Sequence, residues 1–102
     1  MHRITIEYGM PADPEAFEQH YADVHVPLAS TLPELRRFSR SHPRGRGGEA
    51  PYFVAELWFD DADTLKAALK SPEMAATAAD AQTFAVASMT MFTGEVAETT
   101  LR

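Results

Sequence analysis

The stretch Tyr52-Phe53-Val54-Ala55-Glu56-Leu57-Trp58-Phe59 decides the fold, because only Glu56 interrupts its apolar run. A short apolar run of this kind is typical of a strand that is buried on both faces, since an amphipathic strand would alternate apolar and polar residues. We therefore expect a strand at positions 52–59 that lies inside a sheet and needs a covering layer on each side.

Three other segments have strand character. Apolar and polar residues alternate over positions 3–8, which predicts a strand with one apolar face. Positions 35–41 predict a second strand that is rich in Arg and Ser, with one edge exposed to water. Positions 86–96 are rich in β-formers and predict the last strand. The polar, glycine-rich segment 42–51 is interpreted as a mobile hairpin loop.

A helix is predicted from position 14, where Asp13 is a candidate N-cap and Pro14 suits the first helical position. Its core stripe recurs at steps of four, three and four residues, at Phe17, Tyr21, Val24 and Leu28. Pro27 should bend this helix, because an interior proline removes one N–H donor at a cost of about 3 kcal/mol.

Two more helices are predicted downstream. The acidic cluster Asp60, Asp61 and Asp63 caps a helix that runs to about Lys70. Ser71 as N-cap and Pro72 at the first position then start a short third helix.

The resulting order is strand, helix, strand, strand, helix, strand over a single domain, residues 1–102. This order predicts an α+β, ferredoxin-like βαββαβ fold with a four-stranded antiparallel sheet and its helices on one face. The apolar strand 52–59 would then keep one uncovered face. We expect a second copy to cover it, which gives a homodimer through packed sheets, a dimeric α/β barrel.

Composition and charge exclude several classes of protein. The 45% hydrophobic and 24% charged content is that of a globular domain, and no apolar run is long enough for a membrane helix. The net charge of −6 disfavours nucleic-acid binding. We therefore interpret the arginines between positions 36 and 46 as solvent-exposed residues of a strand and a loop. No cysteine is present, and no signal peptide opens the chain, so we expect a cytoplasmic protein with neither membrane nor nucleic-acid partner.

His25 is the first candidate for chemistry, because the ordinary pKa of a histidine lies near neutrality and suits a general acid or base. Tyr21, one helical turn earlier, is its candidate partner, either orienting the ring or donating to a substrate oxygen. A structural role remains open, in which His25 bonds a carbonyl freed by Pro27.

His20 is expected at the flank of the same helix. Five residues separate it from His25, which corresponds to about 140° around a regular helix. The two rings would meet only if the bend at Pro27 turned them, so the spacing argues against a metal site. We predict no cofactor, although a lone histidine can also be an axial haem ligand.

Aromatic side chains offer an apolar pocket for a small hydrophobic molecule. The candidates are Tyr8, Phe17 and Trp58, and Tyr8 and Trp58 each carry a polar group that needs a partner when buried. Glu56 within its apolar strand is either a general base or, as we expect, the partner of an arginine such as Arg37 or Arg40.

Several ordered blocks together cover nearly the whole chain, namely Tyr8–Tyr21, His25–Ala29 with the H-x-P pattern, Leu32–Phe38, Pro51–Phe59, Ser71–Glu73 and Thr93–Val96. In these blocks the chain resembles the EthD family, named for a protein encoded alongside an ethyl tert-butyl ether-degrading system. The resemblance implies a dimeric α/β-barrel fold. Relatives of this fold include cofactor-free decarboxylases, lactone isomerases, polyketide cyclases and monooxygenases, so the fold alone does not choose a reaction.

Three hypotheses follow. In the first, the protein is an enzyme that moves a proton on a small apolar oxygenated compound, aromatic or a lactone, with His25 as acid or base and Tyr21 holding the oxygen. In the second, it is a non-catalytic small-molecule-binding or accessory protein of a degradation pathway. In the third, it is a structural dimer whose histidine only braces the bent helix.

Overall fold

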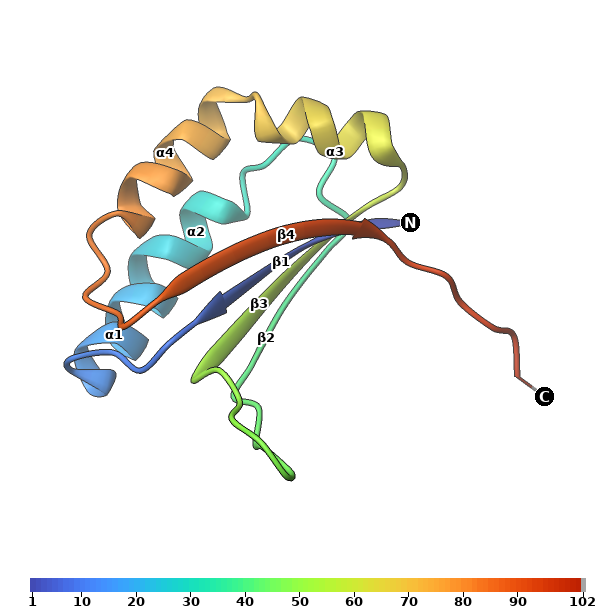
Figure 1. The fold of residues 1–102 in the computed structure, drawn as a ribbon. Helices are drawn as coiled ribbons and strands as arrows, with labels where there is room; N and C mark the ends of the chain where they lie inside the picture. Colours follow the sequence, from blue (N-terminus) through green and yellow to red (C-terminus); the bar gives the residue numbers. More distant parts are fainter. Residues whose placement is uncertain (102) are drawn as a thin grey trace.

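A computed structural model describes residues 1–101, in which four antiparallel strands form one sheet (Figure 1). The strands are β1 (His2–Tyr8), β2 (Arg37–Ser41), β3 (Phe53–Phe59) and β4 (Met89–Glu95). Their order across the sheet is β2-β3-β1-β4. This is the ferredoxin-like arrangement that the element order predicts, with the apolar strand β3 inside the sheet.

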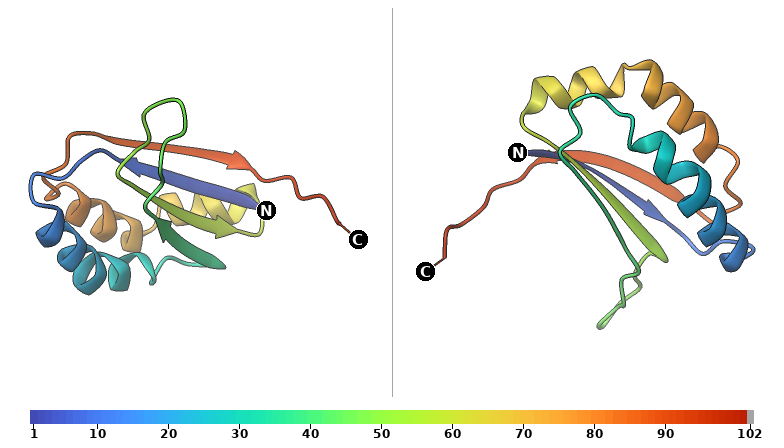
Figure 2. Two further views of the ribbon diagram at one scale, coloured as in Figure 1. Left: turned by 90° about the horizontal axis from the view of Figure 1, so that it is seen from below. Right: turned by 180° about the vertical axis from the view of Figure 1, so that it is seen from behind.

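All helices lie on one face of the sheet, and no other element within residues 1–101 covers the opposite face (Figures 1 and 2). The first helical segment is continuous through α1 (Pro14–His20), the π-helical turn η1 (Tyr21–His25) and α2 (Val26–Ala29). The second consists of α3 (Ala62–Leu69) and α4 (Pro72–Ala81).

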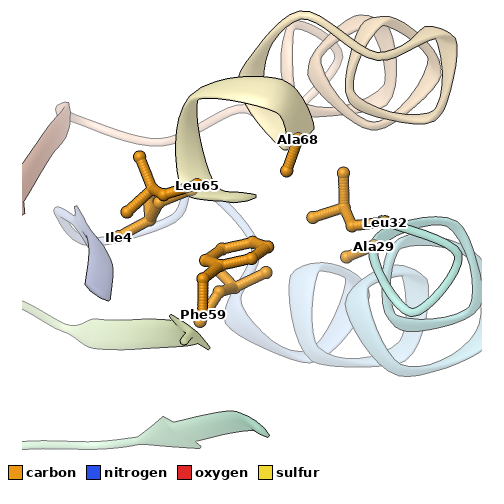
Figure 3. Packing of buried hydrophobic residues seen from close by; sticks show 7 residues of the cluster. Ile4, Ala29, Leu32, Phe59, Leu65 and Ala68 are labelled. Atoms are coloured by element: carbon orange, nitrogen blue, oxygen red, sulfur yellow. The ribbon is translucent and has the colours of Figure 1, made fainter. Parts of the chain in front are cut away.

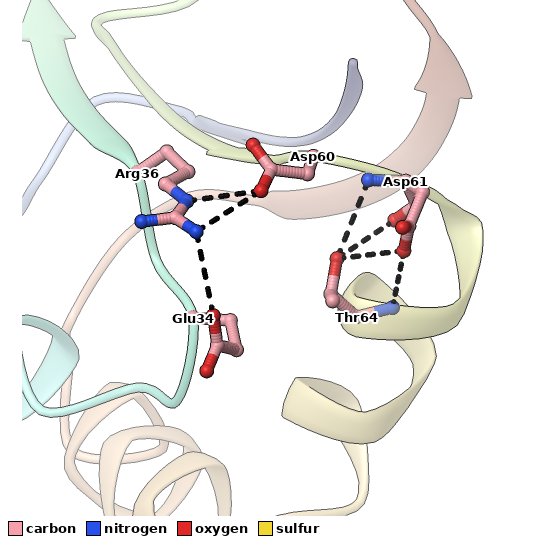
Figure 4. A network of polar contacts seen from close by, with 5 residues as sticks. All are labelled: Glu34, Arg36, Asp60, Asp61 and Thr64. Carbon is pink, nitrogen blue, oxygen red and sulfur yellow. Dashed lines mark hydrogen bonds and ion pairs between the residues drawn. The ribbon is translucent and has the colours of Figure 1, made fainter.

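Side chains at the expected capping positions start three of the helices. The Asp13 carboxylate accepts a hydrogen bond from Ala16 N at 3.1 Å, and Ser71 Oγ accepts one from Met74 N at 3.1 Å. Asp61 and Thr64 form a reciprocal capping box at the start of α3, and the neighbouring Asp60 pairs with Arg36 at 3.1 Å (Figure 4). The local sequence therefore determines where these helices begin.

The helix-covered face of the sheet supports a core of two clusters. The register pairs Ile4 with Leu57 and Tyr8 with Phe53, which places these side chains on the same face. One cluster joins this face to α2 and α3, as Figure 3 shows, through Ile4, Ala29, Leu32, Leu57, Phe59, Leu65 and Ala68. The other lies under α1 and η1 and consists of Tyr8, Phe17, Tyr21, Phe53 and Ala55.

The uncovered face is more polar than the sequence of β3 suggests. Trp58 is buried there under Arg37, whose guanidinium lies 4.6 Å from the ring centroid. Glu56 pairs with Arg3 at 3.0 Å. We expected Arg37 or Arg40 as its partner, but Arg40 is in register with Ala55, on the helix-covered face. Arg3, by contrast, lies diagonally across from Glu56 on the neighbouring strand.

None of the helices within residues 1–101 is both long enough and apolar enough to cross a membrane.

Replacing Leu65 by Ala should destabilise the fold by roughly 2–5 kcal/mol, because this side chain is 4% exposed inside the cluster of Figure 3 and its removal leaves a cavity. Urea denaturation measures the change in the free energy of unfolding. Leu101→Ala is the matched control, since Leu101 is 85% exposed and should lose almost nothing. Equal losses in the two variants would contradict the assigned core.

Candidate functional site

The first helical segment changes its winding at the histidines. In η1 the N–H of Val26 donates to the carbonyl of Tyr21, five residues earlier, instead of the usual four. Residues five positions apart therefore lie nearly above one another across this turn. Pro27, which has no N–H to donate, follows directly in the first turn of α2.

This winding brings His20 and His25 to the same carboxylate, that of Asp80 on α4. His25 Nδ1 lies 2.8 Å from Asp80 Oδ2, and His20 Nε2 lies 2.7 Å from Asp80 Oδ1. A regular helix would have separated the two rings, and the π turn is the physical reason that it does not. Our expectation that His20 stays at the flank is therefore corrected.

The exposed fraction of the side chain rises from His25 through Asp80 to His20. The side chain of His25 is 3% exposed, that of Asp80 11% and that of His20 40%. The ring of Phe84 packs edge-on against both histidines, with centroids 4.9 Å from His25 and 5.8 Å from His20. One carboxylate thus connects a buried imidazole to an imidazole in contact with water.

Burial sets the charge of the inner histidine. Desolvation lowers the pKa of His25 below its ordinary value, and the hydrogen bond to Asp80 opposes this only in part. Burial also acts to raise the pKa of Asp80, but its bonds to His20 and His25 outweigh that effect and hold the pKa below the ordinary value. A neutral His25 beside a carboxylate donates from Nδ1, so its Nε2 carries the free lone pair.

His25 lines an apolar cavity of about 220 Å³ between the helices and the sheet. Its other walls are one face of α4, with Met74, Thr77, Ala78 and Ala81, the C-cap residue Gln82, and the strand residues Ile6, Tyr8, Met89 and Met91. An apolar cavity of roughly 150 Å³ already holds a benzene-sized molecule. This cavity therefore suits a ring-sized apolar compound, and no Lys or Arg lines it.

Tyr8 lies beneath the same cavity and has an unused polar group. The residue is fully buried, and its hydroxyl has no well-formed hydrogen bond to any described residue. Burial raises its pKa to about 12, an effect that the neighbouring Tyr21 hydroxyl partly opposes. The phenol is thus a protonated donor at neutral pH, and a buried donor without a partner is costly.

The other aromatic candidates lie elsewhere. Tyr21 is buried against His25, with ring centroids 4.8 Å apart, and is not among the residues that line the cavity. Burial also raises its pKa. Phe17 belongs to the core and borders a separate cleft beside His20. Trp58 lies on the uncovered face of the sheet and shares no cavity with His25.

Sequence reasoning missed Asp80 and the three methionines of the cavity. Asp80 lies 55 residues from His25, so no local spacing connects the two. It does carry one local signal, because an acidic side chain in the last turn of a helix interacts unfavourably with the helix dipole. Such a residue indicates that a cationic or hydrogen-bonding partner lies nearby. Within residues 1–101, no group of three or more His, Cys, Asp or Glu side chains is arranged to hold a metal ion.

Comparisons with known proteins agree with this fold. The chain is 41% identical over 98 residues to an uncharacterised 11.0 kDa protein from Rhodococcus erythropolis, encoded in the thcB–thcC intergenic region, with 93% of this chain and 95% of that protein covered. A crystal structure of an EthD family protein from Bacillus halodurans superposes with a TM-score of 0.84 at 32% identity, covering 95% and 99% of the two chains.

A dimeric ferredoxin-like protein of unknown function from Thermobifida fusca shares the fold, with a TM-score of 0.70 at 18% identity and 93% and 90% of the chains covered. The sequence profile of the EthD domain matches residues 10–88, a span that includes the two histidines, Asp80 and the strands β2 and β3. On this match and on the relatives above, the chain belongs to the EthD family.

Proposed function

We propose that this protein catalyses proton transfer on a small, apolar, oxygenated compound, with His25 as the general base. The observation that carries the proposal is the position of His25. Its Nδ1 is held by Asp80, while the ring lines an apolar cavity large enough for a ring-sized molecule. Removal from water strengthens the electrostatic contacts made inside such a cavity.

In the proposed reaction, His25 Nε2 takes a proton from a C–H or O–H group next to a substrate oxygen. The Asp80 carboxylate stabilises the imidazolium that forms, and the same imidazolium returns the proton to another atom of the substrate. The reaction is an isomerisation or exchange in which no electrons are gained or lost.

The hydroxyl of Tyr8 is the proposed donor to the substrate oxygen, where negative charge develops as the proton leaves. Its burial and its lack of a well-formed hydrogen bond support this assignment, because a substrate oxygen would complete its hydrogen bonding. Tyr21 is proposed to orient the His25 ring from behind rather than to touch the substrate.

We further infer that two copies pair through the uncovered face of the sheet. Phe92 lies in the middle of β4 and is in register with Thr5, on that face, yet it remains 46% exposed. A protein of the same fold from Thermobifida fusca is described as dimeric. Pairing would bury Phe92 and complete the covering layer that β3 lacks in the single chain.

Deuterium exchange on 2-indanone, a ring-sized aromatic ketone with acidic C–H groups beside its carbonyl, tests the proposed base. Wild-type protein in D₂O should accelerate the exchange followed by NMR, and His25→Gln should lose at least a hundredfold of that acceleration, the scale of one general base. His42→Gln is the matched control, because His42 lies outside the cavity and bonds Glu18. Exchange at equal rates in wild type and His25→Gln would contradict the proposal.

The free energy of unfolding should fall as the pH drops below about 6.5. In this window the unfolded His25 binds a proton while the folded one, with its lowered pKa, does not, so protons favour the unfolded chain. Urea denaturation at pH 7.5 and 5.5 measures this loss. His25→Gln should lose less stability over the same interval, and an identical loss in both proteins would show that His25 is not held neutral by burial.

Phe92→Asp should convert the dimer to a monomer, because it places a charge in the middle of the inferred interface beside Thr5. Sedimentation at micromolar concentration measures the mass. Met10→Asp is the control, since Met10 is 59% exposed in the loop before α1 and lies outside the sheet. A wild-type protein that sediments as a monomer would refute the inferred pairing.

A further inference from the structure

We propose that His20 adds to the effect of burial on the charge state of His25 through the carboxylate that the two share, and so acts as a positioning residue for the base. This inference rests on the function proposed above. It assigns a role to a histidine that is not among the residues lining the cavity.

The geometry divides one carboxylate between two imidazoles. Asp80 Oδ1 lies 2.7 Å from His20 Nε2, and Asp80 Oδ2 lies 2.8 Å from His25 Nδ1. One carboxylate carries a single negative charge and can neutralise a single imidazolium. A second proton would place two cations on it, so the protonation of one histidine opposes the protonation of the other.

The two histidines differ in how easily they can bear a positive charge, because they differ in burial. The side chain of His20 is 40% exposed, and water can solvate its imidazolium. The side chain of His25 is 3% exposed, so a charge there must be withdrawn from water. A positive charge therefore costs less on His20 than on His25, and a charge on His20 works against protonation of His25.

Few other charged or titratable groups lie close enough to affect the charge of His25. The charged or titratable side chains that face the two histidines from the packed elements are Asp80 of α4, Tyr21 of η1, Tyr8 of β1 and Asp13, which borders the cleft beside His20. The charge of Arg40, on β2, acts on Tyr21. Burial raises the pKa of both phenols, so they stay neutral over the range in which a histidine titrates. Asp13 caps α1 and bonds Ala16 N. Asp80 is therefore the link between the two rings.

Replacing His20 by Asn removes the outer charge and leaves Asp80 facing His25 alone. The carboxylate then stabilises the His25 imidazolium without competition, and the protonated form persists to higher pH. The base would be inactivated by protonation at pH values where the wild-type protein still carries a free lone pair on Nε2. His20→Lys keeps a cation at the outer position and should preserve the wild-type behaviour.

NMR titration of the His25 Cε1–H signal in the protein tests this coupling without any substrate. In His20→Asn the midpoint should rise by roughly half a unit or more, which is about a threefold gain in proton affinity. In His20→Lys and in the control His42→Asn the midpoint should not rise. In the wild type, the His25 signal should also shift as His20 titrates, which is a readout that needs no variant.

A His25 midpoint that stays constant or falls in His20→Asn, or a wild-type His25 signal that ignores the titration of His20, would overturn the inference. Its failure is distinguishable from that of the proposed function. A shifted titration without exchange on 2-indanone in the wild type would refute the catalytic proposal alone. Exchange that depends on His25, with an unshifted titration, would refute the role of His20 alone.

Discussion

The carboxylate of Asp80 holds together the two helical segments and the site between them. It bonds His25 of η1 and His20 of α1 from the last turn of α4, and the same helix presents Thr77 and Ala81 to the cavity. If these bonds were lost, α4 would keep only apolar contacts with the first segment, and His25 would lose the partner that fixes its tautomer. Asp80 thus determines both the position of α4, which forms one wall of the cavity, and the chemistry of His25.

Several features that are unfavourable on their own coincide at this place. The π turn departs from regular helical bonding, the acidic Asp80 lies at the C-terminal end of a helix, where the helix dipole disfavours it, and the buried hydroxyl of Tyr8 has no well-formed hydrogen bond. Packing of Tyr21 and Phe84 around His25 and the two bonds to Asp80 offset part of this cost. Such a concentration of local conflicts is expected at a functional site more than in a structural core.

Particular residues show which features of the structure the sequence predicts and which it does not. Alternation at Ile4 and Tyr8 and the capping side chains Asp13, Asp61 and Ser71 are local signals, and each produces the expected strand or helix start. Helical spacing predicted that the rings of His20 and His25 lie apart, because it assumes 3.6 residues per turn. A π turn inserts one residue, and Pro27 is the only local sign of it. Asp80 is a tertiary partner that no local period can indicate. The partner of Glu56 depended on strand register, which the sequence of a single strand does not fix.

The tautomer of His25 at pH 7, measured from the ¹⁵N chemical shifts of its ring in the wild-type protein, tests the assigned role of this residue most directly. We expect a neutral ring with the proton on Nδ1, donated to Asp80, and an unprotonated Nε2. A ring that carries its proton on Nε2, or an imidazolium at that pH, would contradict both the assigned hydrogen bond and the proposed base.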